Sequence, residues 1–130
     1  MFLSRVVLDA ANRKVMEGLV RPSLFHGAVE RSAGPERKRS LWRIDRFRGN
    51  YCMLLVTQDA PDLAVIADQF GLREAQPELK SYDAFLNNLE MDQRWQFRVK
   101  LNPVKCIDSK RCPVMNRDLK TWLSGKAEAN

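Results

Sequence analysis

His26 is the single histidine of the chain and the first residue to consider as a proton donor or acceptor. Imidazole is the side chain whose unperturbed pKa lets it both take and give a proton near neutral pH. The chain has a formal net charge of +6, and a basic surface suits a polyanionic substrate. Together these features point toward RNA phosphodiester chemistry. A lone histidine beside apolar residues is also typical of a hydrogen-bonded structural residue, so composition leaves both readings open.

The residue types that commonly bind metals or phosphate cofactors do not have the spacing in this sequence that such sites require. Cys52, Cys106 and Cys112 show no Cys-x-x-Cys spacing, and only one histidine is available to join them as a ligand. The carboxylates gather between residues 59 and 92 without the close pairs of a two-metal nuclease. Glycine patterns that cradle phosphate are missing. We therefore expect no metal and no cofactor.

The charge is unevenly spread along the chain. The net charge is +6 over residues 1–48, −6 over residues 49–93 and +6 over residues 94–130. If the first and last blocks adjoin in the fold, they form one positive surface opposite an acidic one, as in many nucleic-acid-binding proteins. A solvated surface with accidental clustering is the alternative.

The hydrophobic pattern indicates the elements that must position His26. Residues 2–8 are rich in Val, Leu and Phe and predict a first strand. Residues 10–19 predict a helix that Pro22 ends, and the same proline opens a second helix. His26 lies on this second helix, at the margin of its apolar face.

A hairpin and a third helix follow. Residues 41–47 alternate apolar and charged side chains, and residues 51–56 form an apolar run. Gly49-Asn50 offers the turn between these two strands. Residues 60–70 predict a helix that Gly71 ends.

The remaining pattern completes a recognisable order of elements. Residues 72–81 are polar and predict a loop, residues 82–89 predict a short helix or an extended approach, and residues 94–101 alternate as the clearest strand. The order is β-α-β-β-α-β. This order is typical of a ferredoxin-like α+β sandwich, with an antiparallel four-stranded sheet and helices on one face. Such a fold hosts many functions and fixes none.

Length and hydropathy bound the class of protein. The 130 residues suit one compact domain, which we place at residues 1–114, followed by a closing helix or the start of a linker at residues 115–130. No apolar run approaches the roughly 20 residues that span a bilayer, so we expect neither a membrane helix nor a signal peptide. Cysteines without disulfide spacing suit reduced thiols, and we expect a cytoplasmic protein.

The strand at residues 94–101 is the best binding candidate. Arg98, Lys100 and Lys105 would present cations at intervals along it, and phosphate oxygens accept hydrogen bonds from such groups. An ordinary solvated strand face is the alternative. The three tryptophans could stack on bases, but each falls at the apolar phase of its element, which favours packing in the core.

Several segments together resemble the CasE-type CRISPR endoribonucleases, which cut precursor CRISPR RNA and stay with the guide RNA in the Cascade complex. The resemblance covers nearly the whole chain in the expected order. Its segments are Met1-Phe2-Leu3-Ser4-Arg5, Leu24-Phe25-His26-Gly27-Ala28, Leu41-Trp42-Arg43-Ile44, Tyr82-Asp83-Ala84-Phe85-Leu86, the run from Arg94 to Lys105, and Lys110-Arg111-Cys112-Pro113-Val114.

The resemblance implies a mechanism and partners. His26 falls on the catalytic histidine of the family and would act as general base or general acid in metal-independent cleavage of CRISPR repeat RNA. A ribose 2′-hydroxyl attacks the adjacent phosphate and leaves a cyclic phosphate and a free 5′-hydroxyl. Lys110 and Arg111 join Arg98, Lys100 and Lys105 as RNA-binding candidates. The expected partners are the repeat RNA hairpin and other Cascade subunits.

Two departures from the family pattern matter. Many relatives have a tyrosine three residues before the histidine, whereas this chain has Ser23, whose hydroxyl is far less acidic. Relatives also continue into a second ferredoxin-like domain, so this chain resembles an amino-terminal half, and an exposed half-domain surface could associate with itself. A non-catalytic RNA-binding or Cascade assembly module is therefore a second hypothesis. A ferredoxin-like protein-interaction domain without an RNA role is a third.

Overall fold

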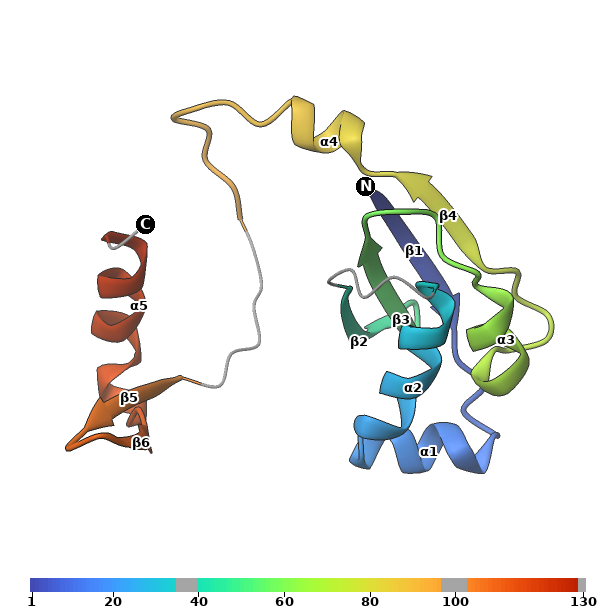
Figure 1. Cartoon of the computed structure of the whole chain (residues 1–130), viewed down its shortest axis with the longest axis horizontal. Coiled ribbons are helices and arrows are strands. Elements are labelled where there is room, and N and C mark those ends of the chain that lie inside the picture. The colour runs from blue at the N-terminus through green and yellow to red at the C-terminus, as the bar shows by residue number, and fades with distance from the viewer. Residues whose placement is uncertain (35–39, 97–102, 129–130) are drawn as a thin grey trace. The chain divides into compact units, whose positions relative to one another are not determined.

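The structure, a computed structural model, describes residues 1–34, 40–96 and 103–128. The chain forms two compact units, Met1–Met91 and Asp92–Asn130 (Figure 1). The first unit holds a four-stranded sheet, and the second holds a two-stranded sheet. In the part of the chain that the structure describes, no helix is long and apolar enough to cross a bilayer.

The first unit follows the predicted order of elements. These are β1 (Phe2–Val7), α1 (Arg13–Val20), α2 (Ser23–Ser32), β2 (Leu41–Phe47), β3 (Asn50–Thr57), α3 (Ala64–Phe70), β4 (Glu78–Ser81) and α4 (Asp83–Asn87). The strands are antiparallel and lie in the order β2-β3-β1-β4. This arrangement confirms the ferredoxin-like α+β sandwich.

The fourth strand corrects one part of the prediction. Residues 72–81 were expected to be a loop, but Glu78–Ser81 form β4 and pair with β1 from Phe2↔Ser81 to Arg5↔Glu78. All four residues of β4 are exposed, so this edge strand needs no alternation of apolar side chains. Of the strand expected at residues 94–101, residues 94–96 are not in a strand, and the others lie outside the described residues.

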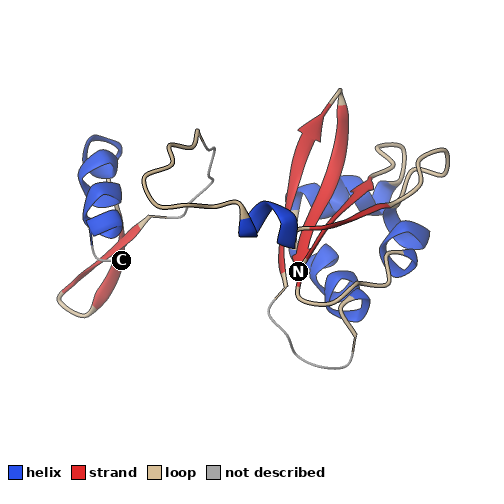
Figure 2. Cartoon of the chain, turned by 90° about the horizontal axis from the view of Figure 1, so that it is seen from above, coloured by secondary structure: helices blue, strands red, loops and turns tan. Residues whose placement is uncertain are grey.

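The core lies between one face of the sheet and the helices α1, α2 and α3 (Figure 2). Phe25 of α2 is completely buried at its centre. Its ring meets Phe70 and Trp42 edge to face, with centroids 5.1 Å and 6.2 Å away, and such pairs contribute about 0.5–1.5 kcal/mol beyond area burial. Gly18 of α1 leaves room for this ring, because a Cβ there would lie 2.5 Å from it.

Residues at the helix ends determine where the two helices that precede β2 begin and end. The Asn12 side chain accepts a hydrogen bond from the backbone N–H of Lys14 and caps the start of α1. Pro22 separates α1 from α2, as predicted, because proline ends one helix and suits the first turn of the next. The two helices therefore meet at a short corner, and Phe25 reaches from α2 back to Gly18.

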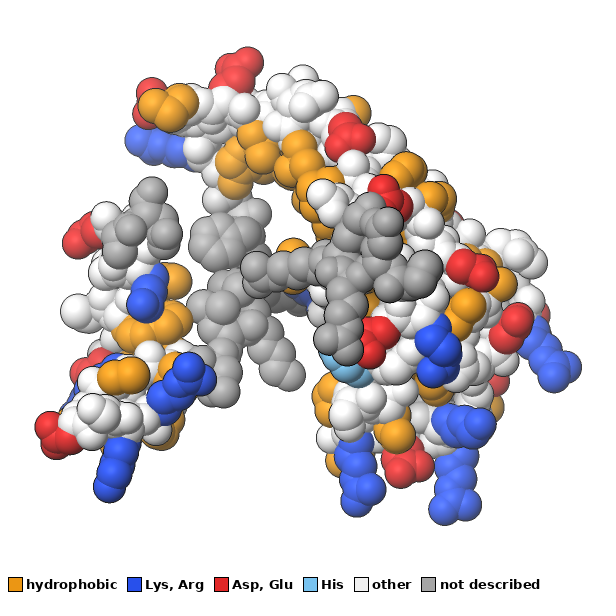
Figure 3. Space-filling model, viewed as in Figure 1, with side chains coloured by type: hydrophobic (Ala, Val, Ile, Leu, Met, Phe, Trp, Pro, Cys, Tyr) orange, Lys and Arg blue, Asp and Glu red, His pale blue; other side chains and the backbone are white. Residues whose placement is uncertain are grey.

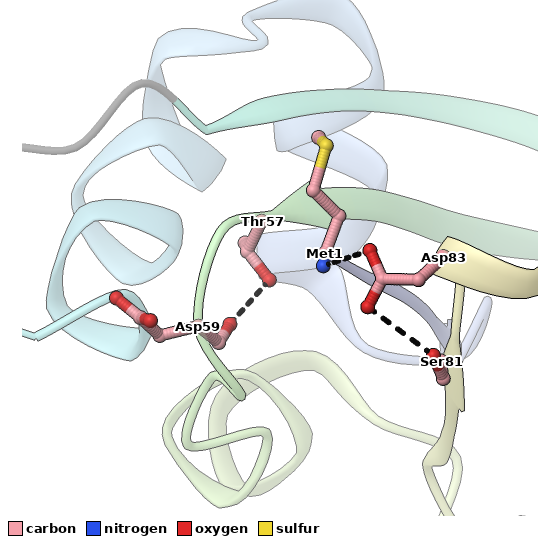
Figure 4. A network of polar contacts seen from close by, with 5 residues as sticks. All are labelled: Met1, Thr57, Asp59, Ser81 and Asp83. Atoms are coloured by element: carbon pink, nitrogen blue, oxygen red, sulfur yellow. Dashed lines mark hydrogen bonds and ion pairs between the residues drawn. The ribbon is translucent and has the colours of Figure 1, made fainter. Parts of the chain in front are cut away.

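Polar contacts fix the amino terminus beside β4 (Figure 4). The terminal ammonium of Met1 lies 2.6 Å from Asp83 Oδ1, and Ser81 Oγ lies 3.5 Å from Asp83 Oδ2. At the end of β3, Thr57 Oγ1 donates a hydrogen bond of 2.7 Å to the carbonyl of Asp59. The start of β1 is thus tied to the junction of β4 and α4.

The second unit contains a hairpin and a helix. Its elements are β5 (Val104–Ile107), β6 (Lys110–Pro113), the short 3-10 turn η1 (Asn116–Asp118) and α5 (Leu119–Glu128). Helix α5 lies within residues 115–130, where the sequence predicts a closing helix or the start of a linker. The Trp122 indole N–H donates to the carbonyl of Val104 at 3.2 Å and links α5 to the hairpin. The boundary between the two compact units lies between residues 91 and 92. The domain limits expected from the sequence, residues 1–114 and 115–130, stay a prediction.

The tryptophans do not all pack in the core. Trp42 is half-buried against the core of the first unit. Trp95 is 56% exposed, so core packing was wrong for this residue. The alternation that suggested burial continues into residues outside the described ranges.

Candidate active site

The register of α2 brings His26 to the edge of the core. Phe25, Ala28 and Val29 are buried and form the inner face of the helix. His26 follows Phe25 directly, so its side chain points away from that face. The imidazole is 60% exposed, and its pale blue surface is visible in Figure 3. His26 therefore lies at the margin of the apolar face, where a large substrate can reach it.

Two side chains flank the imidazole. Glu30, one helical turn further along α2, has its Oε1 atom 3.1 Å from His26 Nε2. Trp42, on β2, has its ring centroid 6.5 Å from that of His26, at an angle of 41°. Trp42 is also held by its edge contact with Phe25. The carboxylate and the indole thus limit the directions that the imidazole can take.

A hollow opens beside these residues at the end of α2. It has a volume of about 600 Å³ and is lined by Gly27, Glu30, Arg31 and Gly34. The Arg31 guanidinium donates a hydrogen bond to Gln69 Oε1 at 3.2 Å, which anchors it to α3. The Arg31 guanidinium, held in place at this hollow, suits an anionic group such as a phosphate. Lys and Arg side chains also gather over the helices of this unit (Figure 3).

Ser23 is the first residue of α2 and is exposed. It precedes His26 by three residues, so the two side chains lie on neighbouring turns of one helix face. A serine hydroxyl titrates far above the physiological range, which limits it to hydrogen bonding. This position can bind a substrate oxygen, but a serine is poorly suited to donate a proton to a leaving group.

The predicted RNA-binding cations belong to the second unit. Lys105 lies on β5, and Lys110 and Arg111 lie on β6, all exposed. The pairs Lys105↔Cys112 and Ile107↔Lys110 put both lysines on one face of the hairpin, whereas Arg111 pairs with Cys106 on the other. Lys105 Nζ is 3.9 Å from Asp118 Oδ2. Arg98 and Lys100 lie outside the described residues.

The cysteines are free in this structure. Cys52 is buried on β3, Cys106 is exposed and Cys112 is half-buried. Burial raises the pKa of the Cys52 thiol, and the nearby positive charge of Arg5 offsets part of this rise. Among the described ranges, no three His, Cys, Asp or Glu side chains gather as metal ligands would.

Sequence reasoning missed the roles of four residues at the candidate site. Glu30 could have been found, because residues four apart on a helix are neighbours. Arg31 was counted only as part of a basic segment, and the role of Gln69 as its anchor depends on tertiary packing of α2 on α3. Trp42 was assigned to the core, and its second role as a neighbour of His26 follows from the pairing of elements in space.

Comparisons with known proteins give a consistent result. A family described as CRISPR associated protein matches residues 1–130. The CRISPR-associated endoribonuclease Cse3 of Thermus thermophilus is 32% identical over 111 residues, which cover 81% of this chain and 50% of that protein. The chain thus spans about half the length of the curated relative that it matches.

The solved structures include a similar fold. The CRISPR endoribonuclease Cse3, in a structure with a 19-nucleotide RNA bound, matches 98% of this chain with a TM-score of 0.77 and 25% identity. The match covers 62% of the Cse3 chain. The family model matches all 130 residues, the curated relative is above 30% identity and the solved structure shares the fold. The chain belongs to the CRISPR associated protein family.

Proposed function

We propose that this chain is a metal-independent endoribonuclease domain that binds CRISPR repeat RNA and cleaves it by general acid–base catalysis. The observation that carries the proposal is the position of His26, an exposed imidazole flanked by the Glu30 carboxylate and the Trp42 indole. The similarity to Cse3 names the class of substrate. Cytoplasmic location and association with other Cascade subunits are parts of the same proposal.

The proposed reaction needs little from the protein beyond proton transfer and charge stabilisation. The 2′-hydroxyl of a ribose loses its proton and attacks the neighbouring phosphorus, and the bond from phosphorus to the 5′-oxygen of the next nucleotide breaks. The products are a 2′,3′-cyclic phosphate and a free 5′-hydroxyl. His26 takes the proton from the attacking hydroxyl or gives one to the leaving oxygen. DNA offers no such hydroxyl, so the reaction is restricted to RNA.

The neighbours of His26 have supporting roles in this proposal. Arg31 stabilises negative charge that develops on the phosphate oxygens, because its guanidinium lines the hollow beside Glu30. Glu30 faces Nε2 of the imidazole and acts as a positioning residue for the ring. Arg98, Lys100, Lys105, Lys110 and Arg111 bind the RNA backbone in the same proposal. Phosphate contacts of this kind position RNA without reading its sequence.

The test is cleavage of a CRISPR repeat RNA from the same genome in the presence of a metal chelator. We expect cleavage to persist with chelator and to give cyclic phosphate ends, detected by mass spectrometry. A repeat RNA with deoxyribose at the cut position should bind with similar affinity and stay intact. Loss of cleavage with chelator, or cleavage of the deoxyribose substrate, would contradict the proposal, because either points to a metal-activated water as nucleophile.

A second candidate function is a non-catalytic RNA-binding or Cascade assembly module. The observation behind it is that the chain spans about half the length of the curated relative Cse3 that it matches. Repeat RNA binding without product distinguishes this module from the enzyme. The same assay repeated with the other half of Cse3 supplied in trans shows whether that half restores cleavage.

A further inference from the structure

The turn between β2 and β3 carries an unusual group of exposed side chains. Figure 2 shows these two strands running on past the rest of the sheet to a short turn. Phe47, the last residue of β2, is 48% exposed. The guanidinium carbon of Arg5 lies 5.0 Å from the centroid of its ring, and that of Arg48 lies 5.3 Å from it. An exposed aromatic ring thus holds two cations in place.

The two guanidinium groups differ in whether a carboxylate pairs with them. Arg5 is bonded to Glu78 on β4, and this hydrogen bond raises the pKa of Arg5 above its ordinary value. Arg48 lies in the turn, and no described carboxylate forms an ion pair with it. Its exposed N–H groups are available to an anion that reaches this face. Phe47, Arg5 and Arg48 together are called the hairpin platform below.

The hairpin platform lies on the face of the sheet opposite the helices. Ser4 and Val6 of β1 are buried toward α1, α2 and α3, so Arg5 between them points to the other face. Arg46, in contrast, pairs with Tyr51 across the hairpin, and its guanidinium carbon is 5.3 Å from that ring. Because Arg46 and Phe47 are consecutive, their side chains project to opposite faces of the hairpin.

We infer that the hairpin platform is a binding site for single-stranded RNA, in which Arg48 and Arg5 contact phosphate and the ring and guanidinium planes of the platform stack on a base. This inference rests on the proposed function, since it takes RNA as the polyanion. An exposed aromatic side chain beside cations is the combination that sequence-tolerant binders of single strands use. The site is separate from His26, which lies on the helical side of the sheet.

The turn offers a variant that removes the cation and keeps the backbone. Arg48 and Gly49 have φ of 50° and 85°, which is the pattern of a type I′ turn, and asparagine is favoured at the first of these positions. Arg48→Asn should therefore leave the hairpin intact. Arg46→Gln is the matched control, because it removes one exposed cation from the same hairpin on the opposite face.

The experiment measures binding of the full chain to a fluorescent oligouridine of about 12 nucleotides, a length within the range of single-strand sites, over a series of salt concentrations. Arg48→Asn should raise Kd by about five-fold, and each lost phosphate contact should reduce the slope of log K against log salt by about 0.7. Phe47→Ala should raise Kd by about five-fold or more, as expected for loss of one stacked base. Arg46→Gln should leave the slope within error of the original chain.

Three outcomes would overturn the inference. These are no binding of oligouridine by the original chain, equal losses for Arg46→Gln and Arg48→Asn, or unchanged binding in both platform variants while thermal denaturation shows them folded. Failure of the proposed function is recognised separately. It appears as absence of repeat RNA cleavage, whereas the oligouridine assay scores binding without any cleavage step.

Discussion

Replacing Gly18 by alanine should destabilise the chain even though alanine is the better helix former. In an open helical position, glycine to alanine gains about 1 kcal/mol. At Gly18 the new Cβ would lie 2.5, 2.7 and 2.9 Å from three carbons of the Phe25 ring. The ring is completely buried and is held by Phe70 and Trp42, so it cannot retreat freely. Overpacking of this kind costs about 1–3 kcal/mol.

Gly27 of α2 supplies the matched control. It is also in a helix interior, but a Cβ there meets only the Arg31 guanidinium, at 3.5 Å. Gly27→Ala should therefore stabilise the chain by about 1 kcal/mol, and Gly18→Ala should be about 1–3 kcal/mol less stable than Gly27→Ala, which is the overpacking cost alone. Urea denaturation followed by tryptophan fluorescence measures both free energies of unfolding. Equal stability of the two variants would refute the packing of Phe25 against α1.

Three further predictions follow from the structure. Gly49→Ala should cost about 1–2 kcal/mol of unfolding free energy, because φ is 85° there and a Cβ is strained in that region; an unchanged denaturation midpoint would argue against the type I′ turn. Iodoacetamide should modify Cys106 well before Cys52, because Cys52 is buried and its raised pKa leaves less thiolate at neutral pH; peptide mass spectrometry measures the order, and faster labelling of Cys52 would contradict its placement. Glu30→Gln should lower kcat for repeat RNA by about two- to five-fold with little change in KM, since the pair with His26 is exposed; a change confined to KM would show that Glu30 only affects binding.

The fold could largely be predicted from sequence because most elements carry a buried face. The helical period of α2 placed His26 at the margin of the apolar face that includes Phe25. The alternation of apolar and charged side chains along β2 indicated the hairpin. β4 was missed because its four residues are all exposed and depend on β1 for pairing. The turn was predicted one residue late, at Gly49-Asn50, because arginine seldom takes the positive φ that Arg48 has.

Less of the candidate site could be predicted from the sequence. The histidine itself is conspicuous by its type, but Trp42 and Gln69 reach the site from other elements, and only tertiary packing brings them to α2. The expectation that the basic blocks at the two ends of the chain form one surface stays a prediction, because Lys105, Lys110 and Arg111 lie in the second unit.

The most direct test is single-turnover cleavage of CRISPR repeat RNA by His26→Ala, with RNA affinity measured on the same preparation. The exposed position of His26 means that its removal should leave folding and binding nearly unchanged. Loss of a general acid or base should slow cleavage by about 10²- to 10⁴-fold. A His26→Ala variant that cuts repeat RNA at the rate of the original chain would contradict the assignment of His26 as the proton-transfer group.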